Sequence, residues 1–232
     1  MNSFDAARVE TVLVDSYSTL VDMRSLEDAL AEYTEKAREA ATIWFQRSKI
    51  YGITATQFDE FRPCREKYRH SLNYALQSVG ASVSPTDQED ILTALDRLTV
   101  FDDVRTGLKR LTDHGYEVYV LSNGGLDMLA TLIDHAEIDD IISETVSASE
   151  IGLYKPDQRL YRHAAVRTET PITGLAHVTA SWNDVHGAMQ SGMQGVWLNR
   201  RGTEWEAFLD EPHLTVESFH EFGDILNVES NN

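Results

Sequence analysis

The sequence predicts an α/β protein with a doubly wound parallel sheet and an α-helical cap inserted after the first strand. Two observations lead to this prediction. After about residue 100, short apolar segments alternate with amphipathic ones, and such strand–helix alternation is typical of a parallel sheet with helices on both faces. Between residues 22 and 96, the long periodic segments all have helical spacing.

The predicted cap follows directly on the first strand. The segment VETVLV, residues 9–14, is short and apolar, and it predicts a buried strand that ends in Asp15. Pro63 lies inside a later helical segment and predicts a first turn or a kink there. The helical segments that follow the first strand lie at residues 25–47, 55–79 and 86–98.

The rest of the chain alternates between the two kinds of segment. We expect helices at residues 102–115, 126–138, 155–168 and 184–192. We expect strands at residues 116–125, 141–149, 174–181 and 193–200. In an open parallel sheet the ligand crevice lies at the carboxyl ends of the strands, so an insertion after Asp15 would close over that crevice. We therefore assign a Rossmann-like core to residues 1–21 and 97–232, and the cap to residues 22–96.

The composition argues against several classes of protein. The formal net charge of −18 gives a field that repels nucleic acid and anionic membrane surfaces. No apolar run approaches the length of a membrane span, the first residues lack the pattern of a signal peptide, and the single cysteine, Cys64, excludes an internal disulfide. We expect a soluble cytoplasmic protein. Only five of the 20 basic residues are lysines, which fits either an ordinary acidic protein or one adapted to concentrated salt.

Polar side chains follow four of the predicted strands, at the point where each strand ends. A lone aspartate, a lone Ser-Asn-Gly turn or a lone lysine would each be explained by a turn or a solvated surface. Their joint occurrence in this order is much harder to explain by chance. The residues concerned are Asp15, Ser122 and Asn123, Lys155, and then Thr179, Ser181 and Asp184.

In this arrangement the chain resembles the haloacid dehalogenase superfamily, and more closely its L-2-haloacid dehalogenase branch. DSYSTLVD, residues 15–22, is similar to the D-x-Y-G-T-L-x-D motif of that branch. Three further segments resemble its later motifs, namely VLSNGG at 120–125, YKPDQRLY at 154–161 and WLNRRG at 197–202. The resemblance covers nearly the whole chain and implies a hydrolase with a helical cap.

The residue two places after the nucleophile distinguishes the branches. In the phosphatases of the superfamily it is a second aspartate, which protonates a departing alkoxide. A halide leaves as a stable anion and needs no such acid, and this chain has Tyr17 at that position. We therefore expect Tyr17 to form a wall of the substrate pocket. We expect no metal or other cofactor, and Mg²⁺ only if the protein is a phosphatase after all.

The resemblance also implies roles for individual residues. Asp15 would attack the carbon that bears the halogen and form an aspartyl ester, which water then hydrolyses. Lys155 would orient Asp15, and Asp184 would bind Lys155 and help place the water. The predicted catalytic set is Asp15, Lys155, Asp184, Ser122 and Thr19. Substrate contacts are predicted for Tyr17, Ser16, Asn123, Phe45, Gln46, Tyr161, Thr179 and Ser181, with Asn123 receiving the halide.

The chain departs from the pattern of the branch at four positions. Phe45 occupies the position of a cap arginine that is thought to receive the halide, and Arg47 or Arg24 could substitute for it. The other departures are Ser181 in place of an asparagine, Asn183 in place of a tryptophan, and Ser18 in place of a glycine. The eight histidines have no metal-binding spacing, and we expect all of them to be surface or helix residues.

Two other functions stay open at this point. The chain could be a phosphatase of small phosphoesters, or a non-catalytic relative that binds small acids. The partner expected from the resemblance is a small-molecule carboxylate, and a homodimer is a further possibility by analogy.

Overall fold

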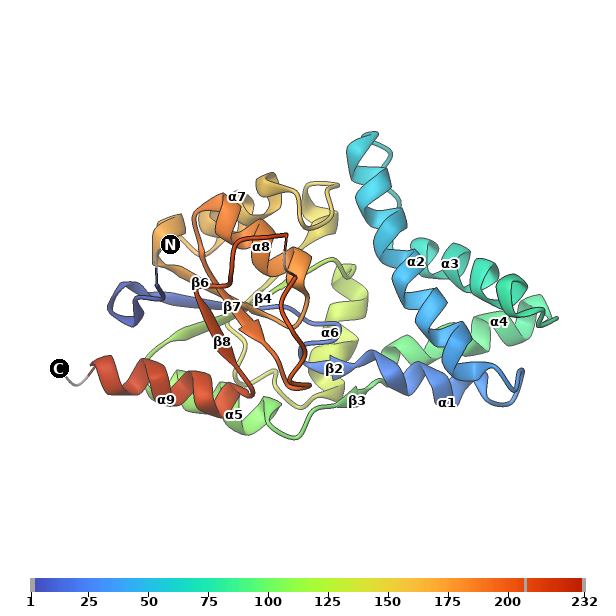
Figure 1. Cartoon of the computed structure of the whole chain (residues 1–232), viewed down its shortest axis with the longest axis horizontal. Coiled ribbons are helices and arrows are strands. Elements are labelled where there is room, and N and C mark those ends of the chain that lie inside the picture. Colours follow the sequence, from blue (N-terminus) through green and yellow to red (C-terminus); the bar gives the residue numbers. More distant parts are fainter. Residues whose placement is uncertain (1–2, 207, 231–232) are drawn as a thin grey trace.

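The computed structural model describes residues 3–206 and 208–230. Its centre is a parallel six-stranded sheet with the order β5-β4-β1-β6-β7-β8 (Figure 1). The order places β1 between β4 and β6, so the residue that follows β1 lies in the middle of the sheet edge. The strands are β1 (Thr11–Val14), β4 (Glu117–Ser122), β5 (Thr145–Ser147), β6 (Leu175–Thr179), β7 (Gln194–Leu198) and β8 (Leu214–Val216).

Helices cover both faces of this sheet. Residues of α5, α6 and α9 share one apolar cluster with β1, while residues of α7 and α8 pack in a second cluster on the other side (Figure 1). All residues of β1, β6 and β7 are buried, as expected for strands enclosed between two helical layers. The helices are α5 (Val104–Asp113), α6 (Leu126–His135), α7 (Gln158–Arg167), α8 (Trp182–Ser191) and α9 (Phe219–Ser230).

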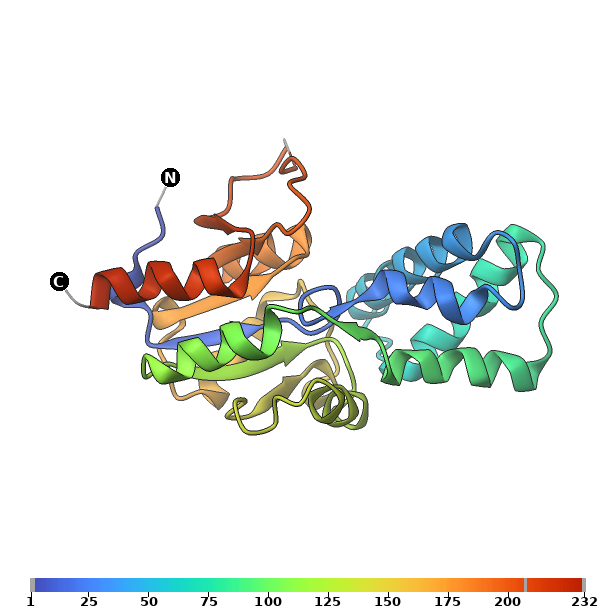
Figure 2. The same ribbon diagram turned by 90° about the horizontal axis from the view of Figure 1, so that it is seen from below.

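Four further helices form the cap, which projects from one end of the core (Figure 2). The indole N–H of Trp44 donates a hydrogen bond to the Tyr68 carbonyl over 2.9 Å, which ties α2 to α3 in the interior of the cap. A short antiparallel pair, β2 (Val21–Asp22) and β3 (Thr99–Val100), connects the two parts. The cap helices are α1 (Leu26–Leu30), α2 (Ala37–Gln57), α3 (Cys64–Val79) and α4 (Pro85–Leu92).

Short 3₁₀ helices complete the fold. They are η1 (Ala6–Arg8), η2 (Met23–Ser25), η3 (Thr93–Asp96), η4 (Ala148–Glu150) and η5 (Ile172–Gly174). No helix in the described part of the chain is long and apolar enough to cross a membrane.

The predicted fold class is confirmed, and the predicted helix bounds in the cap are partly wrong. The segment 25–47 is broken between Leu30 and Ala37, and α2 continues to Gln57. The start predicted for the next helix, at residue 55, is wrong because residues 55–57 form the end of α2. The helix α3 begins after Pro63, which occupies its N-cap position. The strand β8 and the helix α9 lie outside the predicted elements. The domain limits at residues 22 and 96 stay a prediction.

Candidate active site

A pocket lies between the carboxyl ends of the central strands and the cap. The core contributes Asp15, Tyr17, Ser122, Asn123, Lys155 and Asp184 to its lining. The cap contributes Phe45, Ser48, Lys49, Lys67 and Tyr68. The structure therefore brings together strand-end residues that are up to 169 positions apart, from Asp15 to Asp184 (184 minus 15).

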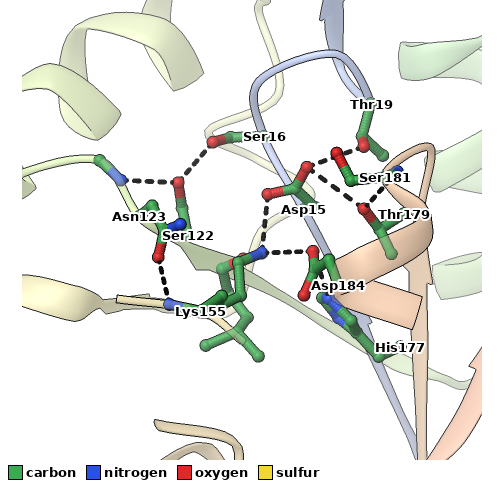
Figure 3. A network of polar contacts seen from close by, with 12 residues as sticks. Asp15, Ser16, Thr19, Ser122, Asn123, Lys155, His177, Thr179, Ser181 and Asp184 are labelled. Carbon is green, nitrogen blue, oxygen red and sulfur yellow. Dashed lines mark hydrogen bonds and ion pairs between the residues drawn. The ribbon is translucent and has the colours of Figure 1, made fainter. Parts of the chain in front are cut away.

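Asp15 forms the floor of the pocket at the end of β1. Its backbone N–H donates to the Val178 carbonyl over 3.0 Å, which continues the ladder between β1 and β6 by one residue. Carboxylate atom Oδ1 accepts a hydrogen bond from Lys155 Nζ at 2.7 Å, and Oδ2 accepts from the Thr19 hydroxyl at 2.9 Å (Figure 3). The Thr179 hydroxyl approaches Oδ2 at 3.4 Å. Both oxygens are thus held while the side chain still faces the pocket.

Lys155 uses all three protons of its ammonium group. They go to Asp15 Oδ1 at 2.7 Å, Asp184 Oδ2 at 2.7 Å and the Leu121 carbonyl at 2.8 Å. Burial alone would lower the pKa of Lys155, but the two carboxylates outweigh it and the pKa is raised. Lys155 therefore stays charged. Its backbone N–H also donates to the amide oxygen of Asn123 at 2.7 Å, which fixes the orientation of that side chain.

Asp184 lies behind Lys155 and has polar contacts on three sides. The Tyr161 hydroxyl donates to its Oδ1 at 2.7 Å, and His177 Nε2 lies 3.0 Å from its Oδ2. Burial would raise the pKa of Asp184, but His177 and Lys155 hold it well below its ordinary value. Asp184 is therefore ionised near neutral pH, and its carboxylate holds Lys155 in place.

His177 is a site residue that the sequence reasoning missed. The expectation that every histidine is a surface or helix residue is wrong for it, because it lies in β6 and its side chain is fully buried. A signal was available in the sequence. A polar residue inside the apolar strand segment LAHVT needs a polar or charged partner in the interior, and here Asp184 lies beside it.

Hydroxyl groups hold the loops at the strand ends in register. The Ser16 and Ser122 hydroxyl oxygens are 2.5 Å apart, and Ser122 also accepts from the Gly124 N–H at 2.9 Å.

Thr19 accepts from the Ala180 N–H at 3.0 Å, which joins the loop after β1 to the loop after β6. The Thr179 hydroxyl accepts from the Ser181 N–H at 3.1 Å. Ser16, Thr19, Thr179 and Tyr161 thus support the site from behind.

Tyr17 lines the pocket, as its expected role as a wall requires. Its side chain is buried, and its hydroxyl has no hydrogen-bond partner among the described residues. Burial raises the pKa of Tyr17 well above the ordinary value for tyrosine. The phenol is therefore too weak an acid to protonate a leaving group near neutral pH.

The cap side of the pocket carries two lysines that sequence reasoning also missed. Lys49 lies one helical turn after Phe45 on α2, so both side chains lie on the same face. Its Nζ donates to the Ser181 hydroxyl at 2.9 Å and lies 4.6 Å from the centre of the Phe45 ring. Lys67 on α3 is buried, with its Nζ 4.3 Å from the centre of the Tyr154 ring. No sequence signal distinguishes these two from the lysines of a solvated helix surface.

Comparison with known proteins identifies the family. The family model of haloacid dehalogenase-like hydrolases matches residues 9–192. The chain belongs to this family. The match covers the first four strands of the sheet in chain order, β1, β4, β5 and β6, and the whole cap.

Curated relatives of this hydrolase include proteins named as dehalogenases. The (S)-2-haloacid dehalogenase 4A of Burkholderia cepacia is 28% identical over 189 residues, which cover 81% of this chain and 82% of the relative. The (S)-2-haloacid dehalogenase of Pseudomonas sp. strain YL is 24% identical, with coverages of 90% and 91%.

Solved structures of dehalogenases share the fold of this hydrolase. One crystal structure of a dehalogenase superposes with a TM-score of 0.89 at 26% identity, covering 94% of this chain and 96% of the other. The L-2-haloacid dehalogenase of Xanthobacter autotrophicus has a TM-score of 0.88 at 21% identity, with coverages of 94% and 98%. At that identity the second likeness shows the fold alone.

The site of this hydrolase does not fit a divalent metal ion. The carboxylates that line the pocket are Asp15 and Asp184, and the Lys155 ammonium already lies 2.7 Å from each of them. Among the described residues, no group of three or more His, Cys, Asp or Glu side chains is placed to share an ion.

The remaining predicted residues have the following positions. Phe45 lines the pocket, whereas Gln46 is exposed and lines a wider groove beside it. The Arg47 guanidinium lies 3.7 Å from the centre of the Tyr74 ring, and Arg24 pairs with Asp22. The two arginines that could have substituted at the Phe45 position thus have partners of their own.

Proposed function

We propose that this hydrolase is a 2-haloacid dehalogenase that acts on short 2-haloacids through an aspartyl ester at Asp15. One observation carries the proposal: the Asp15 carboxylate faces the pocket with both oxygens held, and the side chain two residues later is Tyr17 rather than an acid. The curated relatives that are named (S)-2-haloacid dehalogenases support it.

In the first step, a carboxylate oxygen of Asp15 attacks the carbon that bears the halogen. A C–O bond forms, the carbon–halogen bond breaks, and its electron pair leaves with the halide, with inversion at the carbon. Lys155 and Thr19 each hold one oxygen of the nucleophile, so little reorientation is needed before attack. A halide leaves without a proton, which is why a tyrosine at position 17 is sufficient.

In the second step, water attacks the carbonyl carbon of the Asp15 ester. The 2-hydroxy acid leaves with an oxygen that came from Asp15, and the water oxygen stays in the regenerated carboxylate. Over both steps, a haloacid and water give a hydroxy acid, a halide and a proton. The strongly lowered pKa of Asp184 makes it a poor proton acceptor, so it stays ionised through both steps. The Asp184 carboxylate therefore keeps the Lys155 ammonium in position.

The proposal is tested by halide release from L-2-chloropropionate. The purified protein should release chloride in both low and high salt, and Asp15→Asn should not. Failure of the unchanged protein to exceed Asp15→Asn on any member of a panel of short 2-haloacids would contradict the proposal. The release of phosphate from an aryl phosphate in the presence of Mg²⁺ tests the phosphatase alternative. A cytoplasmic location and a homodimer stay predictions.

A further inference from the structure

Lys49 and Lys67 lie on opposite sides of the nucleophile. The sheet order places β1, and therefore Asp15, between β4 and β6. The Lys49 ammonium donates to Ser181, which follows β6 and begins α8. The Lys67 ammonium lies 4.3 Å from the ring centre of Tyr154, in the segment after β5, and β5 and β4 lie on the other side of β1 from β6. Each lysine of the cap thus lies over a different strand-end loop.

Neither cap lysine has an acidic partner. Within the described residues, no carboxylate oxygen lies within 4.0 Å of the Lys49 or Lys67 ammonium, whereas Lys155 has two at 2.7 Å. Lys67 is only 7% exposed, and a buried cation without a counter-ion is costly to keep. Ring contacts with Phe45 and Tyr154 offset a part of that cost but leave the charge uncompensated. A site that binds anions would explain why two such lysines line one pocket.

The charges that line the pocket specify how many negative charges it can take. Three lysines, at positions 49, 67 and 155, face two carboxylates, Asp15 and Asp184. A substrate with one negative charge therefore balances the pocket. After displacement the Asp15 ester is neutral, and the substrate carboxylate and the halide are two separate anions, so the balance is unchanged. A dianionic substrate would leave the pocket with a net negative charge.

We propose that Lys49 binds the carboxylate of a monoanionic substrate together with the Ser181 hydroxyl, and that Lys67 receives the departing halide. This inference rests on the proposed dehalogenase function. A carboxylate is strongly hydrated and suits the Lys49 side, where a hydroxyl group is available as well as the ammonium. A halide is more weakly hydrated and suits the Lys67 side, where two tyrosine rings, Tyr68 and Tyr154, surround the ammonium. The cap thereby supplies the positive charge that Phe45 cannot.

The test measures the binding of two anions that do not react, propionate and bromide, by calorimetry. Lys49→Met should weaken propionate binding by roughly tenfold or more, the effect of losing a charge-assisted hydrogen bond, with little change for bromide. Lys67→Met should do the reverse. The matched control is Lys109→Met, which removes an exposed lysine paired with Asp113 on α5 and should change neither affinity.

Rescue and kinetics make the assignment sharper. Adding Phe45→Arg to Lys49→Met restores a cation on the same face of α2 and should recover propionate binding. In turnover, Lys49→Met should mainly raise KM, whereas Lys67→Met should mainly lower kcat, because the halide develops its charge in the transition state. Lys67→Gln serves as a second variant, so that a poorly folded methionine variant does not decide the result.

Two results would overturn the inference. One is unchanged affinity for both anions in both lysine variants that retain the melting temperature of the parent. The other is an equal loss of both anions in each variant, which would indicate one shared site. Binding is measured without turnover, so the two tests can fail separately. If each lysine variant loses a different anion but the parent releases no halide from any 2-haloacid, the dehalogenase function is refuted and the two anion sites are still supported.

Discussion

The two walls of the pocket differ in how their charges are partnered. On the core wall, Asp15, Lys155 and Asp184 form a closed chain with contacts of 2.7 Å. On the cap wall, Lys49 and Lys67 point into the same pocket without a carboxylate partner among the described residues. The difference indicates that the core wall is preorganised for the chemical step, while the cap wall is completed by its ligand.

The largest expected effect is a difference in the free energy of unfolding between a lysine variant of the core wall and one of the cap wall. Lys155→Met removes the cation that the buried Asp15 and Asp184 carboxylates share, and it should lower the free energy of unfolding by about 3–5 kcal/mol. Lys67→Met removes a buried cation that has no carboxylate partner among the described residues, so the free energy of unfolding should be unchanged or raised. Urea unfolding of both variants beside Lys109→Met measures the contrast. Equal destabilisation by the two substitutions would contradict it.

The pH dependence of stability tests the partnering of Asp184. Its pKa in the folded protein lies below its ordinary value of 3.8, so the unfolded chain binds the proton first as the pH falls. The stabilisation is therefore present above about pH 4 and is lost progressively below it. Asp184→Asn removes this contribution.

Unfolding at a series of pH values between 5 and 2.5 measures it. Below about pH 4, the free energy of unfolding should fall less steeply with falling pH in Asp184→Asn than in the parent. The two slopes against pH should differ by about 1.4 kcal/mol per pH unit. Parallel curves for the two proteins would show that the carboxylate is not stabilised in the folded state.

The smallest effect concerns backbone strain in the loop after β1. Ser18 has a φ of 74°, a left-handed conformation that costs a residue with a side chain about 1–2 kcal/mol. Ser18→Gly should raise the free energy of unfolding by about 0.5–1 kcal/mol, after allowance for the greater freedom of glycine in the unfolded chain. Thermal unfolding measures the change. A lower melting temperature would show that the serine side chain is needed there.

The difference between the two walls also explains what the sequence could predict. The residues of the core wall follow strands, and the carboxyl ends of parallel strands meet at one edge of the sheet. The positions of Asp15, Ser122, Lys155 and Asp184 were therefore accessible from strand patterns and motif order. The pairing of Lys155 with both carboxylates was implied by the resemblance to the dehalogenase branch.

The cap wall was not predictable in the same way. Which face of α2 points to the pocket depends on how the cap helices pack, and an error of one residue turns a side chain by about 100°. Lysines on helices are also usually solvated, so the sequence did not indicate that Lys49 and Lys67 line the pocket. The break between Leu30 and Ala37 contains no proline or glycine, so composition alone does not reveal it.

The most direct test of the proposed mechanism is a single turnover in ¹⁸O-water, with the enzyme in excess over L-2-chloropropionate. If Asp15 forms the ester and water attacks its carbonyl carbon, one ¹⁸O atom should appear in the peptide that contains Asp15, and the first lactate formed should be unlabelled. Mass spectrometry of the digested protein and of the product measures both. Label in the first lactate with none in Asp15 would show that water attacks the substrate directly and would contradict the nucleophilic role of Asp15.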